Sequence, residues 1–174
     1  PVDRGTVVIT SAGNEGAIPS WRIITAPADA VDVLAIGGVS NSLQKMNSSS
    51  IGPTSDNRIK PDLVALGASV KVVKATGQIS TSSGTSLAAP LVTSLVAGIL
   101  QRYPDLGNKE DIALLRQTSS QASDPDNLVG YGVPNFQAVV NFQEYTPQTD
   151  PFEIFPNPLV EDTLTISPFS PDLI

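Results

Sequence analysis

The chain has 174 residues, of which 40% are hydrophobic, so it is long enough to bury the core of one domain without disulfides. It contains no cysteine and no histidine, which excludes disulfides, thiolate or imidazole metal ligands, and an imidazole base supplied by the chain itself. The net charge is −7 without a basic cluster, so we do not expect nucleic-acid binding. No apolar run is long enough to predict a membrane span.

Proline and charge divide the chain near residue 144. Residues 145–174 contain 6 of the 15 prolines, and residues 117–174 carry 8 acidic residues and no basic ones. The proline-rich stretch 145–151 is predicted to be a linker. Alternating patterns at 152–155 and 163–166 predict two short strands, which are too few to bury a core. This tail is therefore either the start of a further β module or a segment laid along the main domain.

Residues 1–144 alternate between strand and helix patterns. β-Branched runs predict strands at 6–10, 33–36 and 70–73, and apolar spacing predicts helices at 86–103, 109–117 and 135–142. The longest predicted helix carries leucine or isoleucine at helical spacing, at Leu87, Leu91, Leu95, Ile99 and Leu100. This alternation predicts a layered α/β domain with a mostly parallel sheet.

A serine opens the longest predicted helix, within the segment 83–90 (Ser-Gly-Thr-Ser-Leu-Ala-Ala-Pro). Gly84 allows a sharp turn and close approach of a substrate, and the amide of Ser86 lies at the positive end of the helix dipole. This arrangement suits an oxyanion that forms beside a serine nucleophile. The alternative is that Ser86 or Thr85 is simply the N-cap of the helix.

A second polar cluster, 11–16 (Ser-Ala-Gly-Asn-Glu-Gly), directly follows the first predicted strand. Binding groups of α/β folds lie beyond the carboxyl ends of parallel strands. The amide of Asn14 can donate to a developing negative charge without being ionised. The alternative is that Asn14 only forms a left-handed turn beside its glycines.

Together these two clusters resemble the subtilisin-like serine proteases, or subtilases. The matching blocks occur in the family's order at 7–16, 33–39, 60–67 and 84–90, followed by the turn 131–133. The resemblance covers residues 1–144. It implies a three-layer α/β fold with a mostly parallel sheet of the subtilisin type.

The resemblance also implies roles for individual residues. Ser86 is expected to attack the scissile carbonyl, and Asn14 with the Ser86 amide to bind the tetrahedral oxyanion. A substrate pocket is expected from Ala12, Gly13, Glu15, Thr25 and Gly84. Within it, Thr25 is expected near the floor, and Glu15 at the rim, where it can favour basic side chains or simply be solvated.

No cofactor is required by this resemblance, but it implies a place for a structural calcium or monovalent cation. The expected ligands of this weak cation are the backbone carbonyls of Ala28, Ala30 and Val33, with the side chain of Asp62. The alternative is that Asp62 only caps a turn.

The family's catalytic aspartate and histidine precede its asparagine block, and neither is found in this chain. The sequence is therefore expected to be the C-terminal part of a serine endopeptidase domain whose N-terminal half is absent. Alone it is expected to be inactive and to self-associate, its partners being a polypeptide substrate and the missing half. The alternative is a non-catalytic binding or assembly module with the subtilase fold.

Two other catalytic arrangements would use a different base. A related family uses a glutamate base, but it places aspartate at the oxyanion position, where this chain has Asn14. A serine–lysine dyad is the other arrangement, with Lys60, Lys71 or Lys74 as the base, although no pattern in the sequence positions any of them.

The tail has a resemblance of its own. Residues 152–158 (Phe-Glu-Ile-Phe-Pro-Asn-Pro), followed by 164–166, are similar to the start of the C-terminal sorting module of type IX secretion cargo. The segment 152–174 is thus expected to begin such a module. This implies that the parent protein is secreted or displayed at the cell surface.

Overall fold

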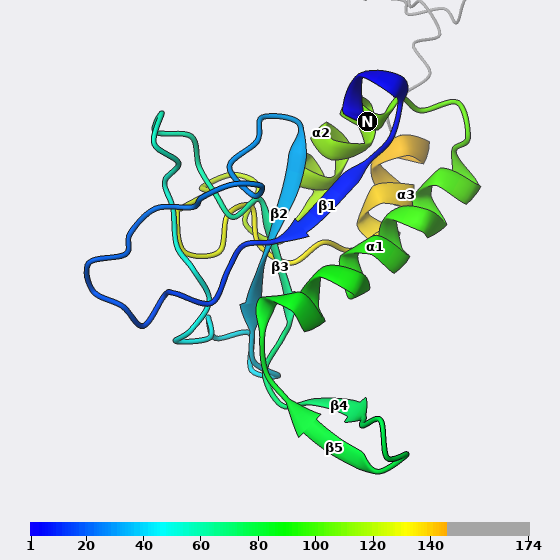
Figure 1. Cartoon of the computed structure of the whole chain (residues 1–174). Helices are drawn as coiled ribbons and strands as arrows, with labels where there is room; N and C mark the ends of the chain where they lie inside the picture. Colours follow the sequence, from blue (N-terminus) through cyan, green and yellow to red (C-terminus); the bar gives the residue numbers. More distant parts are fainter. Residues whose placement is uncertain (146–174) are drawn as a thin grey trace, which may run out of the picture. The chain divides into compact units, whose positions relative to one another are not determined.

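The computed structural model describes residues 1–145, and its centre is a parallel sheet of three strands (Figure 1). The strands are β1 (Val8–Ser11), β2 (Val33–Val39) and β3 (Leu63–Leu66), in the order β1-β2-β3. Val8 pairs with Val33 at one end of the sheet, and Val39 pairs with Leu66 at the other. The predicted parallel sheet is confirmed.

Strand β2 is buried along its whole length, as its apolar sequence requires between two neighbouring strands. It continues through Gly37 and Gly38, three residues beyond the prediction. At Gly37 a Cβ atom would lie only 3.0 Å from side-chain atoms of both Pro61 and Val64. Glycine is needed here because neighbouring side chains fill the space on that face.

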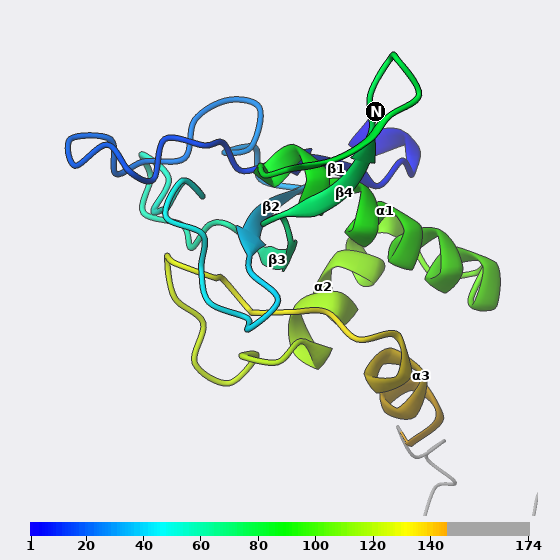
Figure 2. The same cartoon turned by 90° about the horizontal axis from the view of Figure 1, so that it is seen from below.

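Three α-helices contribute to the core on one face of the sheet: α1 (Thr85–Arg102), α2 (Asn108–Thr118) and α3 (Phe136–Tyr145). Leu34 and Ile36 of β2 belong to this core, and Figure 2 shows α1 and α2 on the same side of the strands. The three predicted helices are confirmed to within a few residues. A short 3₁₀ turn, η1 (Val2–Arg4), precedes β1.

Helix α1 is apolar on more sides than the one that it buries: of the five residues that show its spacing, Ile99 is buried and Leu95 is partly buried against the core. The residues that are buried form a stripe of mostly smaller side chains: Thr85, Ala88, Val92, Val96 and Ile99. Leu91 and Leu100 are instead exposed. Because the helix is apolar on several sides, apolar spacing alone does not specify which side packs on the sheet.

The opposite face of the sheet is covered by loop residues. Ala35 points away from Leu34 and Ile36 because side chains alternate along a strand, and it packs with Ala12, Ile24 and Ala28. In residues 1–145 the layer on this face is therefore made of loops, and the third layer of helices expected from the sequence is not found there.

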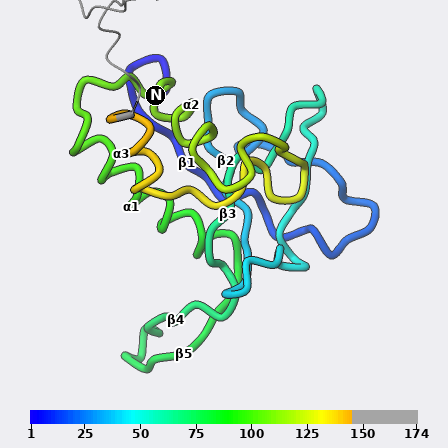
Figure 3. The backbone as a smooth tube through the Cα atoms, turned by 180° about the vertical axis from the view of Figure 1, so that it is seen from behind, coloured from blue at the N-terminus to red at the C-terminus, as the bar shows by residue number. Residues whose placement is uncertain are grey.

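The strand predicted at 70–73 is confirmed, but it does not belong to the three-stranded sheet. It is β4 (Val70–Val73), which pairs antiparallel with β5 (Ile79–Ser82) in a separate two-stranded hairpin. Figure 3 shows this hairpin extending away from the three-stranded sheet. The third strand of the main sheet is β3, which the sequence patterns did not identify.

The chain divides into two units, Pro1–Val140 and Asn141–Ile174. Tyr145, expected to begin the linker 145–151, is the last residue of α3. The rest of that linker and the expected sorting module 152–174 lie outside the described residues.

Candidate active site

The two polar clusters of the sequence meet where β1 ends and α1 begins. Asn14 follows β1 by three residues, and Thr85 is the first residue of α1. The backbone N–H of Thr85 donates to Oδ1 of Asn14 at 3.0 Å. The hydroxyl of Thr85 lies 3.1 Å from the carbonyl oxygen of Gly13 and 3.3 Å from Oδ1 of Asn14, and it donates to both.

These contacts fix the orientation of the Asn14 amide. Because Thr85 donates to Oδ1, the amide nitrogen Nδ2 is the end of the side chain that remains a donor. Thr85 is buried, whereas Asn14 is exposed. The residue that orients the amide therefore lies inside the protein, and the amide donor lies at its surface. The alternative in which Asn14 only shapes a turn does not account for this link to α1.

Gly84 lies between the predicted nucleophile and the predicted oxyanion donor. A Cβ atom at this position would be 3.3 Å from Oγ of Ser86 and 3.7 and 3.9 Å from Oδ1 and Nδ2 of Asn14. Ser86 and Asn14 therefore border the same small space, which stays open because residue 84 has no side chain. The structure thus brings three of the predicted site residues together.

The N-cap of α1 is Gly84, which has no side chain, and the first helical N–H, that of Thr85, is accepted by Oδ1 of Asn14. The alternative in which Ser86 or Thr85 serves as the N-cap is therefore wrong. Ser86 is the second residue of the helix and is exposed, and the amides of a first turn have no acceptor within their own helix. The Ser86 hydroxyl and the helix N-terminus thus face the same region, which suits stabilisation of an anion.

The expected substrate pocket corresponds to a hollow of about 250 Å³ beyond the end of β1. Four of the five predicted residues line it: Ala12, Gly13, Glu15 and Thr25. Gly84 is not among its lining residues. Trp21 also lines this hollow, and sequence patterns could not predict this because the tryptophan lies in a loop without a recognisable pattern.

The carboxylate of Glu15 is held in this hollow by Ser50. The hydroxyl of Ser50 donates to Oε2 of Glu15 at 2.7 Å and accepts from the backbone N–H of Glu15 at 3.0 Å. Gly13 has a φ of +107°, and a Cβ there would lie 2.7 Å from the hydroxyl oxygen of Ser50. Glycine at position 13 therefore gives Ser50 the room to orient Glu15.

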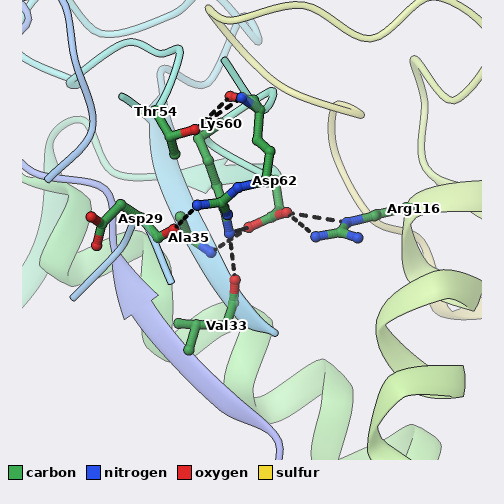
Figure 4. A network of polar contacts seen from close by, with 8 residues as sticks. Asp29, Val33, Ala35, Thr54, Lys60, Asp62 and Arg116 are labelled. Carbon is green, nitrogen blue, oxygen red and sulfur yellow. Dashed lines mark hydrogen bonds and ion pairs between the residues drawn. The ribbon is translucent and has the colours of Figure 1, made fainter. Parts of the chain in front are cut away.

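Asp62 is the centre of a buried network and does not cap a turn (Figure 4). Its Oδ2 accepts from Nζ of Lys60 at 2.6 Å and from the backbone N–H of Ala35 at 2.7 Å. Its Oδ1 accepts from both Nε and Nη2 of Arg116. The second acceptor of Lys60 is the carbonyl oxygen of Val33, at 2.5 Å. Burial lowers the pKa of Lys60, and the charge of Asp62 acts in the opposite direction.

This network is relevant to two predictions: a lysine base for Ser86, and a cation bound by Val33 and Asp62. Lys60 directs its ammonium to Val33 and Asp62, so it is not placed as a base for Ser86. Lys71 lies in the β4–β5 hairpin, and in residues 1–145 no lysine is hydrogen-bonded to Ser86. Two of the four expected cation ligands, Val33 and Asp62, are in contact with Lys60. Within the same residues, no cluster of three or more acidic side chains could hold a metal ion.

A parallel sheet, with a serine in the first turn of a helix beside an asparagine amide, is an arrangement typical of serine hydrolases of the α/β class. The model of the subtilase family, peptidase S8, matches residues 1–132, and the chain belongs to this family.

Relatives from Bacillus subtilis support this assignment. The chain is 31% identical over 137 residues to subtilisin NAT of the subspecies natto, an alignment that covers 79% of this chain and 34% of the relative. It is 31% identical over 153 residues to the serine protease AprX, with 75% and 34% covered. The chain thus spans about a third of the length of these relatives.

Solved structures agree with the fold. The serine protease MycP1, described as an essential component of the type VII (ESX-1) secretion system, superposes with a TM-score of 0.64 at 28% identity, over 79% of this chain and 44% of that one. The psychrophilic protease S41 gives a TM-score of 0.66 at 27% identity, over 76% and 49%. Among residues 1–145, none of the helices combines the length and the apolar character that crossing a membrane requires.

Proposed function

We propose that this chain carries the nucleophile and the oxyanion donor of a serine endopeptidase. The observation that supports this most directly is the shared space over Gly84, bordered by Oγ of Ser86 and the amide of Asn14. Family membership supplies the reaction, which is hydrolysis of peptide bonds through an acyl-enzyme. The substrate is a polypeptide.

The reaction follows from these positions. Oγ of Ser86 attacks the carbonyl carbon and loses its proton to a base, while the carbonyl oxygen becomes an oxyanion. Nδ2 of Asn14 and the backbone N–H of Ser86 donate to that oxyanion. The C–N bond then breaks, the amine leaves with the proton held by the base, and water hydrolyses the resulting ester of Ser86.

The base and its orienting aspartate lie outside residues 1–174 in this proposal. The chain contains no histidine, and it spans about a third of the relatives it matches. Polypeptide outside these residues would also complete the three-layer fold and the substrate cleft. The chain by itself is therefore expected to be inactive.

Glu15 gives the pocket a preference for basic substrate side chains in this proposal. Ser50 orients its carboxylate along the wall of the hollow, where a lysine or arginine side chain could approach it. We further propose that the parent protein is secreted or displayed at the cell surface. The similarity of residues 152–174 to a sorting module supports this location.

The test is covalent labelling of Ser86 with a fluorophosphonate, measured by intact mass. We expect a single adduct on the full-length protein, none on its Ser86→Ala variant, and none on the 174-residue chain alone. An adduct at Ser86 of the isolated chain would show that the chain supplies its own base. No adduct on the full-length protein would favour the non-catalytic binding or assembly module.

A further inference from the structure

The cation site that the family resemblance implies does not fit the residues present. Two of its four expected ligands are the carbonyl oxygen of Val33 and the carboxylate of Asp62. Nζ of Lys60 lies 2.5 Å from the first and 2.6 Å from the second. Figure 4 shows this ammonium placed between the two oxygens. A metal ion bound by the same oxygens would have to occupy the place of the ammonium.

We infer that Lys60 supplies a built-in positive charge at this position, and that the protein binds no metal ion between Val33 and Asp62. This inference concerns the stability and ion dependence of the fold, and it does not depend on the proposed reaction.

Charge balance around Asp62 supports the inference. One carboxylate carries a single negative charge, and it already contacts two cations, Lys60 on Oδ2 and Arg116 on Oδ1. Oδ2 also accepts the N–H of Ala35, so both oxygens are occupied. Lys60 and Asp62 are almost completely buried, where displacing one member of a hydrogen-bonded pair is costly.

The surroundings would also repel an additional cation. A hollow of about 310 Å³ beside the network is lined by three basic side chains, Arg58, Lys60 and Arg116. Asp32 is the acidic residue among its lining residues, and it already pairs with Lys109 at 3.0 Å. An ion entering through this hollow would therefore pass three basic side chains, of which Arg58 is paired with Asp56, before it reached Asp62.

The covalent attachment of Lys60 makes its charge different from that of a bound ion. Lys60 and Asp62 immediately precede β3, Val33 and Ala35 belong to β2, and Arg116 belongs to α2. The ammonium thus links β2 to the start of β3 and cannot dissociate when the medium is diluted or a chelator is added. The stability of this part of the fold is expected to be independent of metal ions.

The test compares the full-length protein with its Lys60→Met variant, which removes the charge and keeps a long side chain. Thermal unfolding is followed in sodium, potassium and calcium chlorides against choline chloride at the same ionic strength. We expect Lys60→Met to lower the Tm in choline, and one of the metal ions to restore part of the loss, at roughly millimolar concentration for calcium. The Tm of the wild-type protein should show no saturable increase with any of these metal ions.

Lys45→Met is the matched control, because Nζ of Lys45 donates to the carbonyl oxygen of Met46 at 2.8 Å and has no carboxylate partner among residues 1–145. It should respond to the ions as the wild type does. Equal responses of Lys60→Met and the wild type would overturn the inference.

A second measurement applies if Lys60→Met does not fold. Wild-type crystals soaked in rubidium chloride should show no anomalous density between Val33 and Asp62, and a peak at this position would overturn the inference.

Discussion

The amide oxygen of Asn14 accepts a hydrogen bond from the backbone of Thr85, a residue 71 positions later in the chain. This contact joins the end of β1 to the first turn of the helix that carries Ser86. Because Thr85 is adjacent to Ser86, the proposed oxyanion donor and the proposed nucleophile are held by the same turn. A displacement of Asn14 or of Thr85 would break these hydrogen bonds.

Replacement of Asn14 tests its role as a donor. Asn14→Asp keeps an oxygen for Thr85 and loses the amide donor, whereas Asn14→Ala loses both. We expect each variant to lower kcat of the full-length enzyme by about 10²–10³, because one oxyanion donor is removed. Only Asn14→Ala should also lower the Tm. Full activity in Asn14→Asp would contradict the proposed role.

Thr85 is expected to be a positioning residue. Thr85→Val removes the hydroxyl that contacts Gly13 and Asn14, and keeps the backbone N–H and nearly the same volume. One such hydrogen bond contributes about 1 kcal/mol, so kcat should fall roughly fivefold while KM is unchanged. Thr85→Ser retains the hydroxyl and should restore kcat. Equal losses in both variants would point to packing instead of orientation.

Glu15 is expected to set a charge preference in the substrate pocket. Glu15→Gln should reduce kcat/KM for peptides with lysine before the scissile bond by roughly fivefold, the equivalent of about 1 kcal/mol, and leave peptides with a neutral residue there unchanged. Ser50→Ala is the matched control, because it keeps the charge and loses its orientation. An unchanged ratio of the two substrates in Glu15→Gln would show that the carboxylate is merely solvated.

Asp111 is expected to make stability depend on pH. It is fully buried in α2, neither carboxyl oxygen finds a hydrogen-bond partner within residues 1–145, and burial, with a contribution from Glu110, raises its pKa above the usual 3.8. Between pH 3.8 and the raised pKa, the native state retains a proton that the unfolded state has lost. Stability should therefore fall as the pH rises through this range.

Asp111→Asn tests this effect, because it removes the ionisable group and keeps the shape. At pH 7 the variant should be more stable than the wild type by about 1–3 kcal/mol, and the difference should shrink towards pH 4. Denaturant unfolding at pH 7 and at pH 4 measures this difference in the free energy of unfolding. Asp105→Asn, at an exposed position between α1 and α2, should change stability at neither pH.

The isolated 174-residue chain is expected to self-associate. Within residues 1–145, β1 pairs only with β2, which leaves one edge of β1 without a strand. An unpaired strand edge favours association with another chain. Light scattering after gel filtration should show dimers or larger species, and a monodisperse monomer with a cooperative melt would contradict this expectation.

Local sequence patterns predicted the elements whose residues are apolar on all sides or strongly periodic. The run that begins at Val33 predicted β2, because a strand buried on both faces needs no alternation. The same patterns predicted the strand at 70–73, did not identify β3, and indicated no sheet for either segment. Which of the two segments lies beside β2 depends on contacts that are distant in the sequence.

Local sequence patterns likewise identified only part of the candidate site. Asn14 and Ser86 could be named from their blocks, because the glycines and the helix start beside them are local features. Ser50, which orients Glu15, has no local signal and lies 35 residues away. Lys60 and Arg116 could be seen as charges, but not as the partners of Asp62.

The sequence by itself determined the family, the parallel α/β architecture and the chemical groups available to the site, including the absence of an imidazole. These properties follow from residue types and from spacings along one segment. The tertiary structure decided which face of α1 is buried, which donor holds the amide of Asn14, and that Lys60 occupies the place expected for a cation. Those outcomes depend on distances between segments separated by tens of residues, which no local pattern encodes.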